Sequence, residues 1–355
     1  MNWERLPDFP WDTLAPARAR ASAHGLIDLS IGTPVDPTPA VITDALTAHA
    51  NAPGYPTTAG LESLREAIQG WIERRLSGVG GAAVLPTIGS KEAIATLPWV
   101  MGVSGTLVVP EVAYPTYAVG GVAAGLDVVA TDRPEDVPEA GAVWINSPSN
   151  PTGRVLSAER MAEIVTVARD RGIPILSDEC YIELGWDARP VSVLHPDVNG
   201  GDLRGVVAVH SLSKRSTMAG YRFGFLAGDP DLVGPLLERR KHLGEMVPSP
   251  IQHAAVAAYS DDAHVEVQRA RYERRRTVLR DALLQAGFTI DHSEAGLYLW
   301  ATPDEPCWEV VDWFADRGVL VTPGEFYGPQ GARHVRIALT ATDAHIDEVV
   351  ARLTV

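Results

Sequence analysis

Lysine is scarce in this chain, and one of its few lysines lies beside other groups that could do chemistry. Lys91, Lys214 and Lys241 are the three lysines among 30 lysine and arginine residues. Lys214 lies in "HSLSKRSTMAGYRFG", between Ser211 and Arg222. Arginine could replace an exposed lysine at little cost, but only lysine can lose its proton and act as an amine. The stretch therefore indicates amine chemistry at Lys214, with a hydroxyl and a guanidinium nearby.

Three further polar clusters each follow a short apolar run. They are "GSK" at 89–91, "NSPSNPTG" at 146–153 and "SDECY" at 177–181. Taken singly, each has a structural interpretation, because Ser90 could cap a helix and Asp178 could cap a turn. Ligand sites of open α/β sheets lie beyond the carboxyl ends of the strands. We therefore expect the three clusters to converge with Lys214 in one pocket.

The elements that must position these groups are short apolar strands alternating with helical patterns. The strand candidates are residues 82–88, 106–110, 127–131, 142–147, 173–178, 206–211 and 223–228. Continuous apolar runs are typical of strands buried on both faces, and the alternation indicates a mostly parallel sheet between helices. After residue 228 the pattern changes to a small α+β unit. We predict a large domain at 41–245 and a small domain formed by 1–40 and 246–355.

Five motifs in this order resemble those of the fold-type I pyridoxal-phosphate (PLP) enzymes of the aspartate aminotransferase superfamily, class I/II. They are "NPTG", "SDECY", "SLSK", "GYRFG" and "HVRIALT". The resemblance spans most of the chain. It implies an α/β fold with a mostly parallel seven-stranded sheet between helices, a small α+β domain, and a PLP-dependent transaminase activity.

The resemblance also implies a role for each catalytic group. Lys214 would bind the aldehyde of pyridoxal 5′-phosphate and, once released, carry a proton from the substrate. Asp178 would face the pyridine nitrogen and keep it protonated. Asn150 and Tyr181 would hydrogen-bond the phenolic oxygen of the cofactor.

Other residues would hold the two ends of the ligands. The phosphate would be held by Gly89, Ser90, Lys91, Ser211 and Arg222. Tyr114 would stack on the cofactor ring, and Tyr55 would reach the phosphate in the neighbouring subunit of a homodimer. Arg336 would bind the substrate α-carboxylate as a bidentate pair, with Gly32 and Asn150 close to it.

Longer stretches such as "LPDFPWDTLAPARARA" and "APGYPTTAG" resemble the actinobacterial succinyldiaminopimelate aminotransferases. That resemblance implies transfer of the amino group of N-succinyl-LL-2,6-diaminopimelate to 2-oxoglutarate. Both substrates carry a distal carboxylate, for which Arg18, Arg20 and Arg215 are candidates by position. Phe9 and Trp11 could form a lid over the methylene chain. Specificity for aspartate, alanine or aromatic amino acids stays open.

Three other interpretations would use all or part of the same pattern. "SLSK" matches the S-x-x-K motif of penicillin-binding proteins, but the chain lacks SDN and KTG and the motif follows a strand. A PLP-sensing regulator would need an N-terminal DNA-binding domain, and the family pattern already begins near residue 30. PLP-dependent C–S lyases and decarboxylases share all five motifs, so they remain alternatives.

Composition sets the remaining expectations. The net charge of −15 argues against nucleic acid as a partner. No apolar run approaches the ~20 residues of a membrane span, and the first residues do not form a signal peptide, so we expect a cytoplasmic protein. Cys180, Cys307 and the ten histidines show no metal-site spacing. We expect His210 to be structural and the arginine run at 271–276 to be a solvated face.

Overall fold

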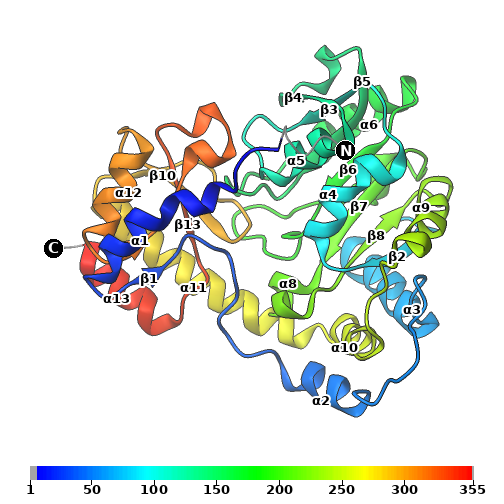
Figure 1. Cartoon of the computed structure of the whole chain (residues 1–355), viewed down its shortest axis with the longest axis horizontal. Coiled ribbons are helices and arrows are strands. Elements are labelled where there is room, and N and C mark those ends of the chain that lie inside the picture. The colour runs from blue at the N-terminus through cyan, green and yellow to red at the C-terminus, as the bar shows by residue number, and fades with distance from the viewer. Residues whose placement is uncertain (1–5, 354–355) are drawn as a thin grey trace.

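Seven strands form the central sheet of the computed structural model, which describes residues 6–353 (Figure 1). Their order is β2-β8-β7-β6-β5-β3-β4, and only β8 runs antiparallel to its neighbours. The strands are β2 (Ala83–Thr87), β3 (Thr106–Val109), β4 (Asp127–Ala130), β5 (Ala140–Asn146), β6 (Ile175–Asp178), β7 (Val206–Ser211) and β8 (Gly224–Gly228). All seven predicted strands and the predicted α/β class are confirmed.

Helices cover both faces of this sheet, because alternate side chains of each strand point to opposite sides. Val207 and Val209 of β7 pack with α4 (Ser90–Met101), α5 (Thr116–Ala124) and α9 (Pro230–Leu243). Val206 and Ala208 pack in a second cluster. Its helices are α2 (Ala40–Ala48), α3 (Glu62–Trp71), α6 (Ala158–Asp170) and α10 (Ser249–Ser260). The continuous apolar runs are therefore explained by burial on both faces.

The N-terminal and C-terminal segments build a second layer with its own core (Figure 1). Its strands are β1 (Ile27–Asp28), β9 (Thr289–Ile290), β10 (Tyr298–Thr302), β11 (Val319–Leu320), β12 (Thr322–Pro323) and β13 (Val335–Ala338). Its helices are α1 (Ala15–Ser22), α11 (Ala263–Gln285), α12 (Cys307–Ala315) and α13 (Asp343–Leu353). β1 pairs with β11, so the start of the chain packs on its end. The domain boundaries at 40/41 and 245/246 stay a prediction.

Short helices complete the chain and connect these elements. They are η2 (Pro10–Leu14), η3 (Ile72–Leu76), η4 (Pro134–Asp136), α7 (Pro196–Asn199), α8 (Leu212–Arg215), η5 (Ala219–Tyr221), η6 (Gly324–Tyr327) and η7 (Pro329–Gly331). α8 carries Lys214 and directly follows β7. Lys214 thus lies on a turn of helix that directly continues a strand of the central sheet.

The prediction of a solvated arginine face at 271–276 is wrong for two of its arginines. Arg275 is 1% exposed and Arg276 is 6% exposed. Arg275 forms ion pairs of 2.7 Å with both Asp36 and Asp343, and Arg276 pairs with Asp187. The physical reason is that three other segments of the chain supply carboxylates to this side of α11, which the local sequence does not reveal.

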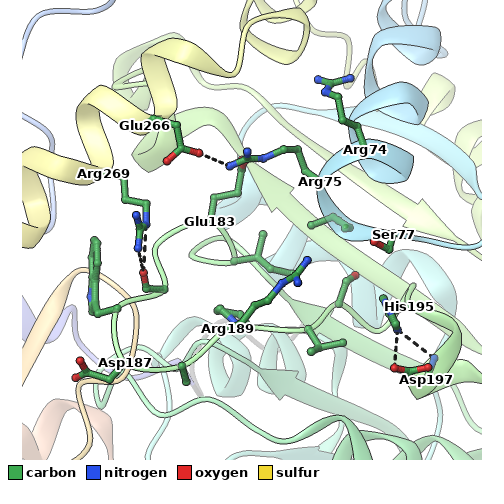
Figure 2. Close-up of a pocket in the computed structure, with 18 residues that line it drawn as sticks. Arg74, Arg75, Ser77, Glu183, Asp187, Arg189, His195, Asp197, Glu266 and Arg269 are labelled. Atoms are coloured by element: carbon green, nitrogen blue, oxygen red, sulfur yellow. Dashed lines mark hydrogen bonds and ion pairs between the residues drawn. The ribbon is translucent and has the colours of Figure 1, made fainter.

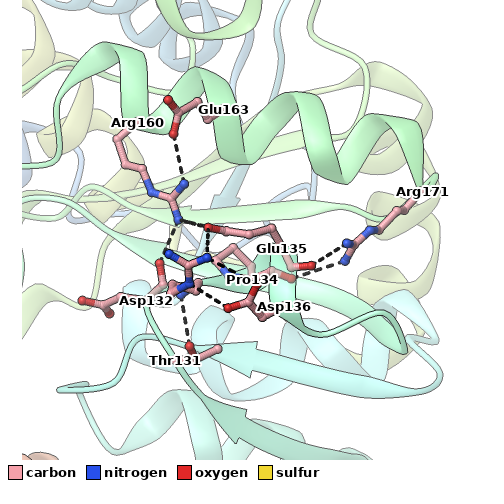
Figure 3. Close-up of polar contacts among 9 residues, drawn as sticks. Thr131, Asp132, Pro134, Glu135, Asp136, Arg160, Glu163 and Arg171 are labelled. Atoms are coloured by element: carbon pink, nitrogen blue, oxygen red, sulfur yellow. Dashed lines mark hydrogen bonds and ion pairs between the residues drawn. The ribbon is translucent and has the colours of Figure 1, made fainter.

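A surface network fastens the turn that follows the edge strand β4 (Figure 3). Arg160 donates to a carboxylate oxygen of Glu135 at 2.9 Å and to the carbonyl of Asp132 at 2.9 Å. Arg171 donates to the carbonyl of Val137 at 2.9 Å. These bonds satisfy carbonyl groups of an irregular segment, so they stabilise the sheet edge.

Within residues 6–353, none of the helices has the length and apolar character that crossing a bilayer requires. The same residues contain no group of three or more potential metal ligands. Cys180 and Cys307 are free thiols.

Candidate active site

A cavity of about 470 Å³ lies at the carboxyl ends of β5, β6 and β7. Its lining residues come from the large sheet, the N-terminal segment and the small unit. They are Phe9, Trp11, Ile31, Gly32, Thr33, Ser90, Lys91, Ile94, Tyr114, Asn150, Asp178, Cys180, Tyr181, Ser211, Ser213, Lys214, Ala219, Gly220, Arg222, Tyr298 and Arg336. The structure thus brings together all the predicted site residues except Gly89, which borders the cavity, and Tyr55.

Lys214 projects into the cavity from α8, which Ser211 caps. The Ser211 hydroxyl accepts from the backbone N–H of Ser213 at 3.1 Å. The Lys214 ammonium donates to the carbonyl of Gly32, on the opposite side of the cavity. Burial lowers the pKa of Lys214 below that of a free lysine. A lowered pKa brings the amine closer to the neutral form that acts as nucleophile and base.

Asp178 is a buried carboxylate that has hydrogen bonds but no cation. The Tyr117 hydroxyl donates to it at 2.7 Å, and the N–H of Cys180 donates at 3.1 Å. No lysine or arginine among residues 6–353 forms an ion pair with it, and burial raises its pKa. A buried carboxylate is costly without a positive partner. The protonated pyridine nitrogen of PLP would supply that partner, so the group fits this cavity.

Asn146 fixes the loop that carries Asn150. Its amide donates to the carbonyl of Asp178 at 3.0 Å, and its oxygen accepts from the N–H of Asn150 at 2.8 Å. The side-chain oxygen of Asn150 accepts from Arg336 at 3.0 Å. The strand ends, the asparagine loop and the small unit are therefore connected by hydrogen bonds.

Arg336 is a buried guanidinium without a carboxylate partner. It is 3% exposed and lies 4.0 Å from the ring centre of Tyr298. It donates to the carbonyl of Ser30 at 2.6 Å and to Asn150, while its Nε has no partner within the described chain. An uncompensated buried charge is destabilising, and a bidentate carboxylate is the ligand that a guanidinium matches best.

At the end of the cavity beside Arg222, the backbone conformation of residue 89 favours glycine. Gly89 has φ +76°, and a Cβ there would lie 2.4 Å from Nη2 of Arg222. Ser90 begins the 12-residue helix α4, whose first N–H groups form an anion site. Lys91 lies 5.3 Å from the ring centre of Phe9, and burial and then the charge of Arg222 lower its pKa. The guanidinium of Arg222 and the N–H groups at the start of α4 fit a phosphate.

Sequence reasoning missed Tyr298, Tyr117 and Asn146. The Tyr298 hydroxyl lies 3.2 Å from that of Tyr181. Burial favours neutral Tyr298, but the charges of Arg336 and Lys214 outweigh it and lower the pKa of Tyr298. A Cβ at position 32 would lie 2.1 Å from the Tyr298 hydroxyl oxygen, which explains the glycine. Asn146 was visible as the polar residue that ends an apolar run, whereas the two tyrosines gave no local signal.

The three arginines proposed for the distal carboxylate do not reach the cavity. Arg18 pairs with Asp28 at 2.6 Å, and Arg20 pairs with Asp316 at 2.6 Å. Arg215 is buried, with an ion pair of 2.5 Å to Glu183.

Two aromatic predictions have different outcomes in this structure. Phe9 and Trp11 line the cavity, as the lid hypothesis requires. Tyr55 is 95% exposed and lies outside the cavity of its own chain. Its contact with a neighbouring subunit stays a prediction.

Comparisons with known proteins agree with this geometry. The model of the family "Aminotransferase class I and II" matches residues 24–353. A probable aminotransferase of Mycobacterium tuberculosis is 56% identical over 98% of this chain and 85% of its own length. The 4-dedimethylamino-4-oxo-anhydrotetracycline transaminase of Streptomyces rimosus is 55% identical over 98% of this chain and 99% of its own.

A solved structure adds the same result at the level of the fold. The probable N-succinyldiaminopimelate aminotransferase of Thermus thermophilus is 27% identical, with a TM-score of 0.87 over 97% of this chain and 99% of its own. The cavity, its unpartnered charges and these similarities lead to one conclusion. The chain belongs to the class I and II aminotransferases, which depend on pyridoxal phosphate.

Proposed function

We propose that this aminotransferase transfers the amino group of N-succinyl-LL-2,6-diaminopimelate to 2-oxoglutarate. The observation that carries the proposal is Lys91. It lines the cavity, and no carboxylate among residues 6–353 forms an ion pair with it. If Arg336 binds the α-carboxylate and Arg222 binds the cofactor phosphate, the side chain of Lys91 is the remaining cation for a distal carboxylate. Arg18, Arg20 and Arg215 do not fill that role. The Thermus neighbour supports the same substrate class by its name.

The residues of the chain divide the chemistry among themselves. Arg336 binds the α-carboxylate as a fork, and Asn150 and Ser30 hold that fork in place. The amine of Lys214 takes the proton from the substrate Cα, which an arginine could not do. Asp178 keeps the ring nitrogen protonated, and bound PLP then supplies an electron sink for the electrons released at Cα.

Aromatic side chains close the cavity on the side of Arg336. Trp11 lies 5.9 Å from the guanidinium carbon of Arg336 and 5.5 Å from the ring of Phe9, centre to centre. Both belong to the N-terminal segment, whereas Arg336 belongs to β13. A wall of this kind excludes water from the ion pair between Arg336 and the carboxylate, which strengthens that interaction.

A second candidate is the amination of a polycyclic ketone. It is favoured by the tetracycline-pathway name of the Streptomyces relative at 55% identity. Phe9, Trp11, Tyr114 and Tyr298 would offer flat surfaces to such a substrate. Aminotransferases for aspartate, alanine or aromatic amino acids, and PLP-dependent C–S lyases, would use the same catalytic residues.

The test is a half-reaction followed by the absorbance of the bound cofactor. The holoenzyme is mixed separately with N-succinyl-LL-diaminopimelate, glutamate, aspartate, alanine and phenylalanine. We expect the first two to convert the cofactor to its amine form with the highest rate constants. The specificity is wrong if alanine or phenylalanine reacts faster than both, and release of ammonia from a cysteine conjugate would identify a lyase instead.

Lys91→Gln separates the distal contact from the common chemistry. Loss of a charge-assisted hydrogen bond of about 1.5–3 kcal/mol should raise KM for the two dicarboxylic donors about 10- to 100-fold. KM for alanine, which lacks a distal carboxylate, serves as the matched control and should change much less. Equal changes for all donors would instead assign Lys91 to the cofactor phosphate.

We also propose a homodimer in which Tyr55 reaches the phosphate of the neighbouring site. Its support is the near-complete exposure of this aromatic side chain in the single chain. Sedimentation should give a dimer, and Tyr55→Phe should weaken PLP binding without changing KM of the amino donor. A monomer with full PLP affinity would refute the proposal.

A further inference from the structure

A second cavity, of about 760 Å³, lies outside the active site (Figure 2). Three segments line it: residues 74–77 at the end of η3, residues 182–197 after β6, and the first half of α11. It shares no lining residue with the active-site cavity. Its volume is within the ~300–1,000 Å³ that small-molecule sites occupy. We call it the arginine cleft.

Three of the four carboxylates that line the arginine cleft have an arginine within ion-pair distance. Arg75 lies 3.0 Å from Glu183 and 2.7 Å from Glu266. Asp187 pairs with Arg276, which lies outside the cleft lining. The carboxylates therefore leave no excess negative charge at these positions.

Asp197 is the remaining acidic residue of the lining, and it lies 3.6 Å from His195. Arg74 is occupied as well, because it pairs at 2.7 Å with Asp262.

Two guanidinium groups of the arginine cleft have no carboxylate partner. Arg189 forms no ion pair within residues 6–353, and Figure 2 shows it in the middle of the cleft without a dashed contact. Arg269 donates to the carbonyl of Gly185 at 2.7 Å and lies 5.6 Å from the ring of Trp186. A guanidinium that stacks on an aromatic ring and bonds a carbonyl keeps its charge available for an anion.

We propose that the arginine cleft binds a small anionic effector that carries at least two phosphate or carboxylate groups. Arg189 would bind one anionic group through its forked N–H donors. Arg269 would bind a second one through Nη1, because its Nε and Nη2 both donate to the carbonyl of Gly185. Trp186 lies beside Arg269 and would contact the organic part of the ligand.

A ligand bound in the arginine cleft would influence the active site through a chain of ion pairs. Arg75 pairs with Glu183, and Glu183 pairs on its other side with buried Arg215, at 2.5 Å. Arg215 directly follows Lys214 in α8. An anion that draws Arg75 towards the cleft weakens its hold on Glu183, so the binding free energies of effector and amino donor are coupled.

Calorimetric titration of the holoenzyme tests the site. The probes are pyrophosphate for the phosphate class and citrate for the carboxylate class. We expect at least one to bind, with Kd raised about 10- to 100-fold in Arg189→Ala and in Arg269→Gln. Arg280→Ala is the matched control, because Arg280 is exposed on the same helix outside the cleft. No binding of either probe, or equal Kd in wild type and both variants, overturns the site.

The effector role has its own readout. KM of the amino donor is measured with and without the bound probe, in wild type and in Arg189→Ala. We expect the probe to change KM of the amino donor in wild type but not in Arg189→Ala. Competition of the probe with the donor at Arg336 would instead change KM in both proteins. Binding at the cleft with an unchanged KM overturns the effector role. Because calorimetry needs no amino donor, failure of the proposed substrate would leave this test intact.

Discussion

Two arginines, Arg275 on α11 and Arg336 on β13, both carry a buried positive charge, but they have opposite kinds of partner. Arg275 is 1% exposed and Arg336 is 3% exposed. Arg275 has carboxylates of Asp36 and Asp343 at 2.7 Å. Arg336 has a carbonyl, an amide oxygen and aromatic rings, but no carboxylate within the described chain.

This difference in counter-ions indicates which buried charges are candidates for ligand binding. A buried charge that the chain neutralises itself stabilises the fold when the pair is intact, and its loss is destabilising. A buried charge that the chain leaves without a counter-ion costs stability and is retained because a ligand completes it. By this criterion we propose that Arg336, Asp178 and Lys214 bind ligands, and that Arg275 is structural. Each of the following predictions tests this comparison.

Substitution of Lys214 should have the largest effect. Lys214→Arg keeps the charge but removes the amine, so kcat should fall by about 10⁴-fold or more. The spectrum of the bound cofactor should change as well, because the covalent link is lost. Circular dichroism serves as the control for folding. Residual kcat above about 1% of wild type would contradict the assignment.

Arg336→Gln should separate activity from stability. Removal of a buried partner of the carboxylate costs about 3–5 kcal/mol of binding, which predicts a loss of kcat/KM of about 10²- to 10⁴-fold. The free energy of unfolding in urea, without amino donor, should be unchanged or higher. A clear loss of stability would show that Arg336 is structural after all.

Arg275→Gln should give the opposite result. Two carboxylates lose their partner, so the free energy of unfolding should fall by about 3–5 kcal/mol. At a temperature where the variant is folded, kcat/KM should stay within a few-fold of wild type. An unchanged urea midpoint would refute the structural role.

Glu179 is a further buried ionisable group, and pH decides whether it is charged or neutral. Its carboxylate accepts from Ser192 at 2.6 Å and from the N–H of Val193 at 2.7 Å, and lies 3.4 Å from Nε2 of His210. Burial raises the pKa of Glu179 from 4.5 to about 7. Burial, and then the charge of Arg215, lower the pKa of His210 to about 3, so His210 is neutral at working pH and does not pair with Glu179 as a cation.

The consequence is a pH dependence of stability. Because the pKa of folded Glu179 exceeds the unfolded value, the folded state binds more protons between about pH 4.5 and 7, and stability falls as pH rises through this window. Glu179→Gln should remove a pH-dependent contribution on the order of 3 kcal/mol to the free energy of unfolding. Urea unfolding across this range measures it, with exposed Glu305→Gln as the control. An identical slope in wild type and Glu179→Gln would contradict the raised pKa.

Tyr298→Phe should give the smallest effect. It removes one hydroxyl contact of 3.2 Å to Tyr181 and keeps the ring beside Arg336. A hydrogen bond of about 1 kcal/mol predicts a fall in kcat/KM of about five-fold. A shift of the pH profile with an unchanged maximum would instead indicate that the Tyr298 hydroxyl acts mainly on the pKa of Lys214.

The sequence predicted the central sheet and the convergence of polar residues at its strand ends for one physical reason. Strands buried on both faces are continuous apolar runs, and Asp178 and Ser211 mark the points where two of them end. Tyr298 was not predictable, because its place opposite Tyr181 depends on how β10 and the small unit pack on the large sheet. Arg275 was mistaken for a surface residue, because its partner Asp36 lies 239 positions away in the chain.

The most direct test of the comparison uses glutarate, a dicarboxylate that lacks the amino group. A ligand that binds only the folded state raises its stability, by about 1.4 kcal/mol at ten times Kd. The free energy of unfolding of the holoenzyme is measured with and without glutarate in wild type, Arg336→Gln and Arg275→Gln. We predict that glutarate raises the free energy of unfolding of wild type and of Arg275→Gln. It should not raise the free energy of unfolding of Arg336→Gln. The same increment in Arg336→Gln as in wild type would contradict the claim that Arg336 is left unpaired for a carboxylate ligand.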